Sequence, residues 1–291
     1  MEKSKSFLVY FFYVILVITW GSSFILMKRG LDFYSPLQVA SIRQVSAAIV
    51  LLSFAVFHIR KIPPNKLGYV LFVALLMMVI PASLFCFAEV GVSSAIAGIL
   101  NALTPAFTLI AGVCFFKQPT SRMQLAGLII GFAGTIFLIL INVSGQLVFN
   151  HFSLLAVAAC ISVGFSINII KKNLAGINPL HIATVSVLFA GLVSLVYLSV
   201  SGQLNILIFT AQNKNSLIAS ATLGILGTAL AQLLYNQVIA KTSAVFASSV
   251  TYVIPIVAVF WGVLDGESLH IWHYTGLVCI IVGVIIMRRS H

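Results

Sequence analysis

Long apolar runs, separated by short polar segments, follow one another along the whole chain. A helix needs about 20 mainly apolar residues to cross the hydrocarbon core of a bilayer. Ten runs reach this length, so the pattern predicts an all-α membrane protein with ten transmembrane helices. The runs lie near residues 7–27, 36–57, 67–88, 94–116, 122–141, 152–170, 179–200, 215–238, 243–264 and 269–287.

Composition agrees with this pattern, and the placement of charge predicts the topology. Of the 291 residues, 61% are hydrophobic and 7% are charged, whereas about a quarter of the residues of soluble domains are charged. With the N-terminus in the cytoplasm, twelve of the 16 Lys and Arg residues fall on cytoplasmic segments, three on external ones, and Arg43 within a span. Cytoplasmic loops are enriched in this way. The net charge of +11 therefore follows from the membrane topology and does not indicate a nucleic-acid partner. We expect a multi-pass inner-membrane protein with both termini in the cytoplasm.

The second half of the chain repeats the first. The matched pairs are Gly21 and Gly164, Ser23 and Ser166, Lys28 and Lys171 at an offset of 143, Asn101 and Thr251, Pro105 and Pro255 at 150, and Gly127 and Gly276, Gly134 and Gly283 at 149. Five spans is an odd number, so the second copy must enter the membrane from the opposite side. Inverted repeats of this kind are usual in secondary transporters, whose cargo binds near the bilayer midplane between the repeats. We expect one five-helix repeat over 1–145 and another over 151–291.

The matched prolines predict a polar site at this midplane. Proline removes a backbone N–H and crowds the carbonyl four residues earlier, which here belongs to Asn101 or Thr251. Counting 1.5 Å per residue places Pro105 and Pro255 roughly 17 Å into a core about 30 Å thick. Unpaired backbone polarity at that depth is tolerated only where protein or a watery cavity satisfies it. The alternative is that each proline only bends its helix for packing.

Other polar residues fall on helix faces near this depth. Gln232, Tyr235 and Asn236 share one face of the eighth span, because positions three and four apart are neighbours, and Ser166 and Asn168 lie in the sixth. They either line a cavity or join helices by hydrogen bonds, as buried amides often do. Gln232 and Asn236 lie toward the cytoplasmic end, where they would suit an inner gate.

Two charged residues stand out in the apolar background. Arg43 lies well inside the second span, where a charge is costly and usually functional; it could instead reach the interface, bind a substrate carboxylate or pair with Glu89. No acidic residue lies at mid-depth, which argues against a carrier that exchanges protons for cationic drugs at a central carboxylate. Glu89, at the outer end of the third span, is the candidate for a proton-titrating group, and the alternative is a solvated helix end.

Neither a metal nor an enzymatic function is expected. His270 and His273 fit no standard ligand spacing, and the neighbouring Trp272 and Tyr274 suggest an interfacial aromatic belt. The chain has none of the common hydrolase motifs and no mid-depth carboxylate pair. No cofactor is expected.

The motifs resemble those of the drug/metabolite transporter superfamily, EamA-like branch. They are Trp20-Gly21-Ser22-Ser23-Phe24, Arg43 with Ala47, Ser93-Ser94-Ala95 leading to Asn101 and Pro105, Ser243-Ala244, Pro255, Gly266-Glu267, and Gly276 with Gly283. The resemblance covers nearly the whole chain and implies a ten-helix inner-membrane carrier that exports amino acids or related metabolites from a cavity lined by the first, third, fourth, sixth, eighth and ninth helices. One departure is Lys117-Gln118, where the family often has a Gly-Glu pair like Gly266-Glu267.

These observations predict a secondary transporter of small neutral or zwitterionic metabolites, such as amino acids, working by alternating access. Its partners would be the cargo, the lipid bilayer and, if Glu89 titrates, protons. The alternatives are an efflux carrier for organic cations or drugs, and a membrane subunit that transports nothing. The candidate binding residues are Trp20, Ser23, Asn101, Pro105, Ser166, Asn168, Gln232, Tyr235, Asn236, Thr251, Tyr252 and Pro255, with Arg43 and Glu89 as charges in the membrane.

Overall fold

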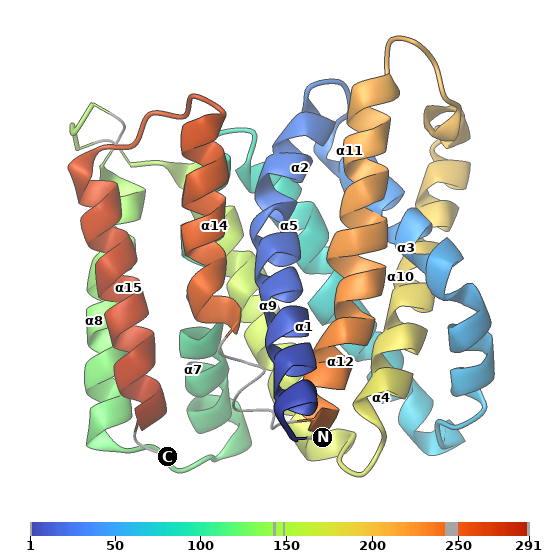
Figure 1. The fold of residues 1–291 in the computed structure, drawn as a ribbon, viewed down its shortest axis with the longest axis horizontal. Helices are drawn as coiled ribbons and strands as arrows, with labels where there is room; N and C mark the ends of the chain where they lie inside the picture. Colours follow the sequence, from blue (N-terminus) through green and yellow to red (C-terminus); the bar gives the residue numbers. More distant parts are fainter. Residues whose placement is uncertain (1, 142–143, 148, 242–249, 290–291) are drawn as a thin grey trace.

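The protein is a bundle of helices that run up and down between two faces (Figure 1). The computed structural model describes residues 2–141, 144–147, 149–241 and 250–289. Within these ranges no β-strand forms, apart from a single bridge between Ile141 and Leu147. Both chain ends lie on one face, which we call the terminal face; the other is the opposite face (Figure 1).

The first half contains five helical units, three of which are interrupted. They are α1 (Glu2–Gly21) with α2 (Ser23–Leu31); α3 (Pro36–Ile59); α4 (Pro64–Ala74), the π-helical turn η1 (Leu75–Val79) and α5 (Ile80–Ala88); α6 (Ser94–Asn101) with α7 (Thr104–Phe116); and α8 (Arg122–Leu140). Local chemistry explains the starts of α3 and α8, because Ser35 and Ser121 each form a capping box with the Gln three residues later.

The described part of the second half follows the same order. Its elements are α9 (His151–Asn173); α10 (Pro179–Val200); the 3₁₀ turn η2 (Leu204–Leu207); α11 (Lys214–Gly224), the π-helical turn η3 (Ile225–Leu230) and α12 (Ala231–Lys241); α14 (Val250–Leu264); and α15 (Ile271–Arg289). The two π-helical turns begin 150 residues apart, at Leu75 and Ile225, the offset that relates Asn101 to Thr251.

Eight helical segments in the described ranges are long and apolar enough to cross a membrane. Two shorter apolar helices, Val253–Leu264 and Ile271–Ile286, coincide with the ninth and tenth expected spans. The chain is therefore an all-α, multi-pass membrane protein, and a full count of ten spans stays a prediction.

Glycines let equivalent helices of the two halves approach closely. A Cβ on Gly134 would lie 2.6 Å from the carbonyl oxygen of Gly276, and one on Gly283 would lie 2.5 Å from that of Gly127. Residue numbers rise along α8 as they fall along α15, so the two helices are antiparallel. Equivalent helices of an inverted repeat must run in opposite directions, as these do.

Helix pairs from the two halves also make equivalent contacts. A Cβ on Gly21 would lie 2.4 Å from the Cβ of Val257, and a Cβ on Gly164 would lie 2.8 Å from the backbone of Phe107. These glycines are 143 residues apart and their partners 150 apart, which are the offsets of the sequence repeat. The same close approach therefore packs α1 on α14 and α9 on α7.

Candidate functional site

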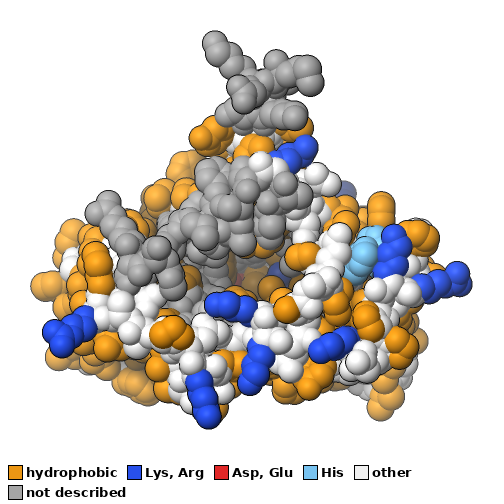
Figure 2. All heavy atoms as spheres, turned by 90° about the horizontal axis from the view of Figure 1, so that it is seen from below, with side chains coloured by type: hydrophobic (Ala, Val, Ile, Leu, Met, Phe, Trp, Pro, Cys, Tyr) orange, Lys and Arg blue, Asp and Glu red, His pale blue; other side chains and the backbone are white. Residues whose placement is uncertain are grey.

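A cavity of about 270 Å³ lies between the two halves of the chain. Its lining comes from seven units of the bundle: Trp20, Ser23, Phe24, Met27, Arg43, Met77, Met78, Phe85, Asn101, Thr104, Val163, Ile167, Gly227, Thr228, Gln232, Tyr235, Thr251 and Ile254. Figure 2, which looks onto the terminal face, shows a hollow near the middle of that face with Lys and Arg side chains around it.

The break between α6 and α7 places Asn101 and Thr104 in the cavity wall. Pro105 is the second residue of α7, and the backbone turns at Ala102 and Leu103 before it. The carbonyl oxygen of Asn101 accepts a hydrogen bond from Thr104 Oγ1 at 2.9 Å. Of the two ways in which the freed carbonyl could be satisfied, protein or a watery cavity, the structure shows the first, because the Thr104 hydroxyl bonds to it.

The second proline is different from the first. Helix α14 continues from Val250 to Leu264 with Pro255 inside it, and Pro255 is buried away from the cavity. A helix can lose the one hydrogen bond that proline removes without ending. The two matched prolines therefore do not act alike, and Thr251 and Ile254 reach the cavity from a helix that is unbroken between Val250 and Leu264.

The guanidinium of Arg43 is the one charged group in the described cavity lining. Its Nε donates a hydrogen bond to Thr228 Oγ1 at 3.0 Å, in the π-helical turn η3. Among the described residues it forms no ion pair, so the alternative in which Arg43 pairs with Glu89 is not observed. The terminal N–H groups of Arg43 are thus left available at the cavity wall.

Aromatic rings form an apolar wall beside this charge. The indole Nε1 of Trp20 donates to the carbonyl oxygen of Gly227 at 3.0 Å, which fixes the ring, and the ring centroid lies 5.3 Å from that of Tyr235. Phe24 and Phe85 meet edge to face at 5.7 Å. The cavity can therefore hold an amphipathic molecule, with one charged end and one apolar end.

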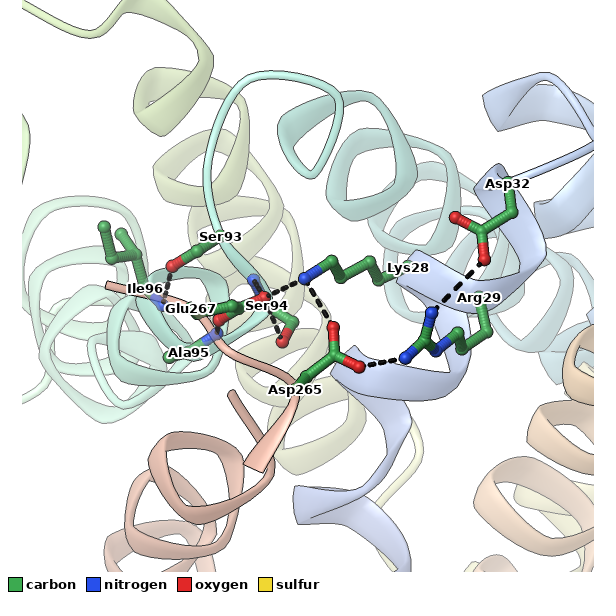
Figure 3. Close-up of polar contacts among 9 residues, drawn as sticks. All are labelled: Lys28, Arg29, Asp32, Ser93, Ser94, Ala95, Ile96, Asp265 and Glu267. Atoms are coloured by element: carbon green, nitrogen blue, oxygen red, sulfur yellow. Dashed lines mark hydrogen bonds and ion pairs between the residues drawn. The ribbon is translucent and has the colours of Figure 1, made fainter. Parts of the chain in front are cut away.

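An ion-pair network closes the bundle at the opposite face (Figure 3). Lys28 Nζ lies 2.7 Å from Asp265 Oδ2 and 2.8 Å from Glu267 Oε1. Glu267 also accepts hydrogen bonds from Ser94 N at 2.9 Å, Ser94 Oγ at 2.8 Å and Ala95 N at 3.0 Å, at the N-terminus of α6. We call these five residues the closing network.

Electrostatics favours the charged form of Glu267. Burial acts to raise the pKa of this carboxyl group, but the hydrogen bonds from Lys28, Ala95 and Ser94 outweigh burial and hold the pKa below its usual value. A helix N-terminus also favours a negative charge. Arg29 extends the network, because it pairs with Asp265 and lies 3.6 Å from Asp32.

The equivalent position at the terminal face carries no acid. Gln118 corresponds to Glu267 at the offset of 149, and its backbone N–H bonds to Gly112 as that of Glu267 bonds to Gly262. Lys171, the counterpart of Lys28, has its Nζ 3.5 Å from Gln118 Oε1. A long hydrogen bond from an ammonium to an uncharged amide thus stands where the opposite face has an ion pair.

The structure brings together half of the residues expected at the site. Seven of the fourteen line the cavity: Trp20, Ser23, Arg43, Asn101, Gln232, Tyr235 and Thr251. Six lie outside the described lining: Glu89, Pro105, Ser166, Asn168, Asn236 and Pro255. The side chain of Tyr252 lies outside the described part of the chain.

The amides and hydroxyls away from the cavity join backbone segments. Asn168 Nδ2 donates to the carbonyl oxygens of Thr108 and Gly164, both at 2.9 Å, and Ser166 Oγ donates to that of Val163 at 2.7 Å. These contacts agree with the alternative in which the polar side chains join helices by hydrogen bonds and do not line a cavity. Thr104, Thr228, Met77 and Met78 were not among the expected residues, although they line the cavity.

Glu89 is not a solvated helix end, so that interpretation is wrong. The residue is 8% exposed, and both carboxyl oxygens are buried with no hydrogen-bond partner among the described residues. Burial, with a smaller contribution from the charge of Glu267, raises the pKa of Glu89 well above its usual range, against the opposing effects of Lys28 and Arg43. The environment therefore favours the neutral acid.

Comparison with known proteins identifies the family. The model of the EamA-like transporter family matches residues 7–140 and matches again over 152–289. The chain belongs to the EamA-like transporter family. An EamA-like transporter is a membrane carrier, and the double match falls on the two halves described above.

Two relatives of this EamA-like transporter are named as a transporter and as an efflux pump. It is 28% identical over 279 residues to the uncharacterized inner membrane transporter YedA of Escherichia coli (strain K12), covering 94% of this chain and 88% of that protein. It is 28% identical over 180 residues to a protein of Salmonella typhimurium (strain LT2) named "Probable amino-acid metabolite efflux pump", covering 62% and 57%. A crystal structure of a protein with 14% identity matches with a TM-score of 0.62, over 96% of this chain and 95% of that one, and supports the fold.

Proposed function

We propose that this EamA-like transporter exports small metabolites, amino acids and related compounds among them, from the cytoplasm by alternating access. The observation that carries the proposal is the cavity, whose lining comes from both halves of the chain. Its volume of about 270 Å³ is close to the lower end of ligand pockets, about 300 Å³. A small metabolite therefore suits it better than a large drug.

The asymmetry of the two faces supports alternating access. The closing network joins α2, α6 and the loop after α14 at the opposite face, whereas at the terminal face Lys171 meets the uncharged amide of Gln118 at 3.5 Å. The terminal face is rich in Lys and Arg, as cytoplasmic faces are. The structure thus suits a state in which the external side is closed and the cytoplasmic side opens more easily.

The two rival functions are less well supported. An organic cation would meet Arg43 and no carboxylate in the described lining, so cation or drug efflux is disfavoured. A subunit that transports nothing has no need of a cavity in which a guanidinium finds no ion-pair partner among the described residues, because a charge inside a span is costly.

Flux into proteoliposomes tests the proposal. Purified protein would be reconstituted and offered a panel of amino acids, N-acyl amino acids, organic cations and sugars, with empty liposomes as the control. We expect saturable flux for amphipathic metabolites and none for large cations. Absence of saturable flux for every class would overturn the proposal.

A further inference from the structure

We infer that Arg43 binds the carboxylate of the cargo, and that the transporter prefers monoanionic carboxylates whose amine is acylated or absent to zwitterions and cations. This inference rests on the proposed export function and departs from the neutral or zwitterionic cargo expected from the sequence. It depends on the position of Arg43 and on the distribution of the acids in the chain.

Arg43 is placed to receive a carboxylate. Thr228 holds Nε through its hydroxyl at 3.0 Å, which leaves the terminal nitrogens as the free end of the fork. A guanidinium fork binds a carboxylate with two parallel hydrogen bonds. A charge inside a span is costly, Arg43 is partly buried, and none of the described acids lies within ion-pair distance of its guanidinium. A cargo carboxylate would remove that cost on binding.

The chain has no acid to receive an ammonium group in the same cavity. It contains five acidic residues: Glu2, Asp32, Glu89, Asp265 and Glu267. The last two belong to the closing network, Asp32 lies near Arg29, and Glu2 is next to the N-terminus. Residues 242–249 contain no acidic residue, so this undescribed segment adds none. The fixed charge of the cavity wall is that of Arg43.

The remaining acid does not serve as an ammonium partner either. Glu89 is outside the cavity lining, and its oxygens are buried away from the surface. A zwitterion would therefore bring its ammonium into a wall that offers only neutral groups and the like charge of Arg43. Like charges at short range are unfavourable, and more so where water is excluded.

The neutral polar groups of the wall match an amide better than an ammonium. Asn101 and Gln232 each offer a carbonyl oxygen and an NH₂ group, and Thr104 offers a hydroxyl. An N-acyl group presents one N–H and one C=O, both of which these side chains can pair. Trp20 and Tyr235 supply the apolar surface for the cargo side chain.

Three probes with one side chain separate the possibilities. N-acetylphenylalanine is an anion, phenylalanine a zwitterion and phenylalaninamide a cation at neutral pH. Binding to the purified full-length protein would be measured by isothermal titration calorimetry, and flux would be measured in proteoliposomes. We expect the affinities to fall in that order.

Variants assign the preference to Arg43. Arg43→Gln removes the charge and is expected to weaken binding of N-acetylphenylalanine about 10- to 100-fold, which corresponds to hydrogen bonds to a charged group. Arg43→Lys keeps the charge without the fork, and its affinity for N-acetylphenylalanine is expected to lie between those of the wild type and Arg43→Gln. Lys214→Gln, which removes an exposed basic residue outside the cavity lining, is the matched control and should leave the order unchanged.

Each outcome decides the inference. The inference is overturned if phenylalanine or phenylalaninamide binds as tightly as N-acetylphenylalanine. It is also overturned if no probe binds, or if folded Arg43→Gln binds N-acetylphenylalanine as tightly as the wild type does. If Arg43→Gln does not fold, the wild-type order and the Arg43→Lys variant decide. Binding in the expected order without flux would support the carboxylate site and count against export alone.

Discussion

Replacing Glu267 with glutamine should open the transporter toward the opposite face. The Glu267 carboxylate accepts four hydrogen bonds, from Lys28 Nζ, from the N–H and hydroxyl of Ser94, and from the N–H of Ala95. Glutamine keeps one acceptor oxygen, and its NH₂ group cannot accept. The variant therefore loses the charge and part of the hydrogen bonding while the size of the side chain is retained.

The expected cost follows from the burial of Glu267. Its side chain is 4% exposed, whereas that of Lys28 is 33% exposed and keeps Asp265 as a partner. A hydrogen bond to a charged group contributes about 1.5–3 kcal/mol, and a negative charge at a helix N-terminus about 0.3–1 kcal/mol. Allowing for the remaining contacts, the closed state should be destabilised by about 3 kcal/mol relative to the open state, which corresponds to about a hundredfold increase in the open fraction.

Thiol labelling measures this change. Asn101→Cys, in a background without the four native cysteines, would be exposed to a membrane-impermeant thiol reagent from the external side. Glu267→Gln should raise the labelling rate about a hundredfold. Asp32→Asn is the matched control, because Asp32 has a 58% exposed side chain 3.6 Å from Arg29 and should change the rate little. An unchanged rate in Glu267→Gln would refute the role of this network in closure.

Three further predictions follow from individual contacts. The melting temperature of the wild-type protein in detergent should fall as the pH rises above the ordinary carboxyl pKa, because Glu89 can ionise only when the protein unfolds. Glu89→Gln should remove this fall. Parallel curves of melting temperature against pH for the wild type and the variant would contradict the prediction. Gly134→Val should lower the free energy of unfolding by about 1–3 kcal/mol, because the new side chain meets the backbone of α15. Gly68→Ala has open space around it and should raise the free energy of unfolding by about 0.5–1 kcal/mol. Denaturation of the purified protein in detergent measures both. Gln118→Glu gives Lys171 an ion-pair partner and should slow labelling of the cavity from the cytoplasmic side up to about fivefold; faster labelling would count against it.

The sequence predicts the helices well because span length and apolar content set them directly. The apolar runs coincide with eight helices of spanning length and two shorter ones. The glycine offsets also have a physical meaning, since Gly134 and Gly276 allow the close approach of α8 and α15. Arg43 could be singled out because charge is rare in a span.

Other parts of the site have no comparable signal. Met77 and Thr228 reach the cavity from π-helical turns, which depend on the hydrogen bonding of the backbone and not on an apolar or polar period. The pair of Lys28 with Glu267 joins residues 239 positions apart, and in the sequence each is only a charge beside a span. The prolines show the converse: a clear signal in the sequence has two outcomes, because Pro105 lies at the break between α6 and α7 whereas Pro255, at the matching position, lies inside the continuous helix α14.

On the proposed function, cargo passes through the cavity between the two halves. The decisive measurement is flux through the Asn101→Cys protein in proteoliposomes, before and after a bulky thiol reagent fills the cavity. We expect saturable flux that the reagent abolishes, and we expect added N-acetylphenylalanine to protect the flux from the reagent. Flux that continues unchanged after complete modification would contradict it.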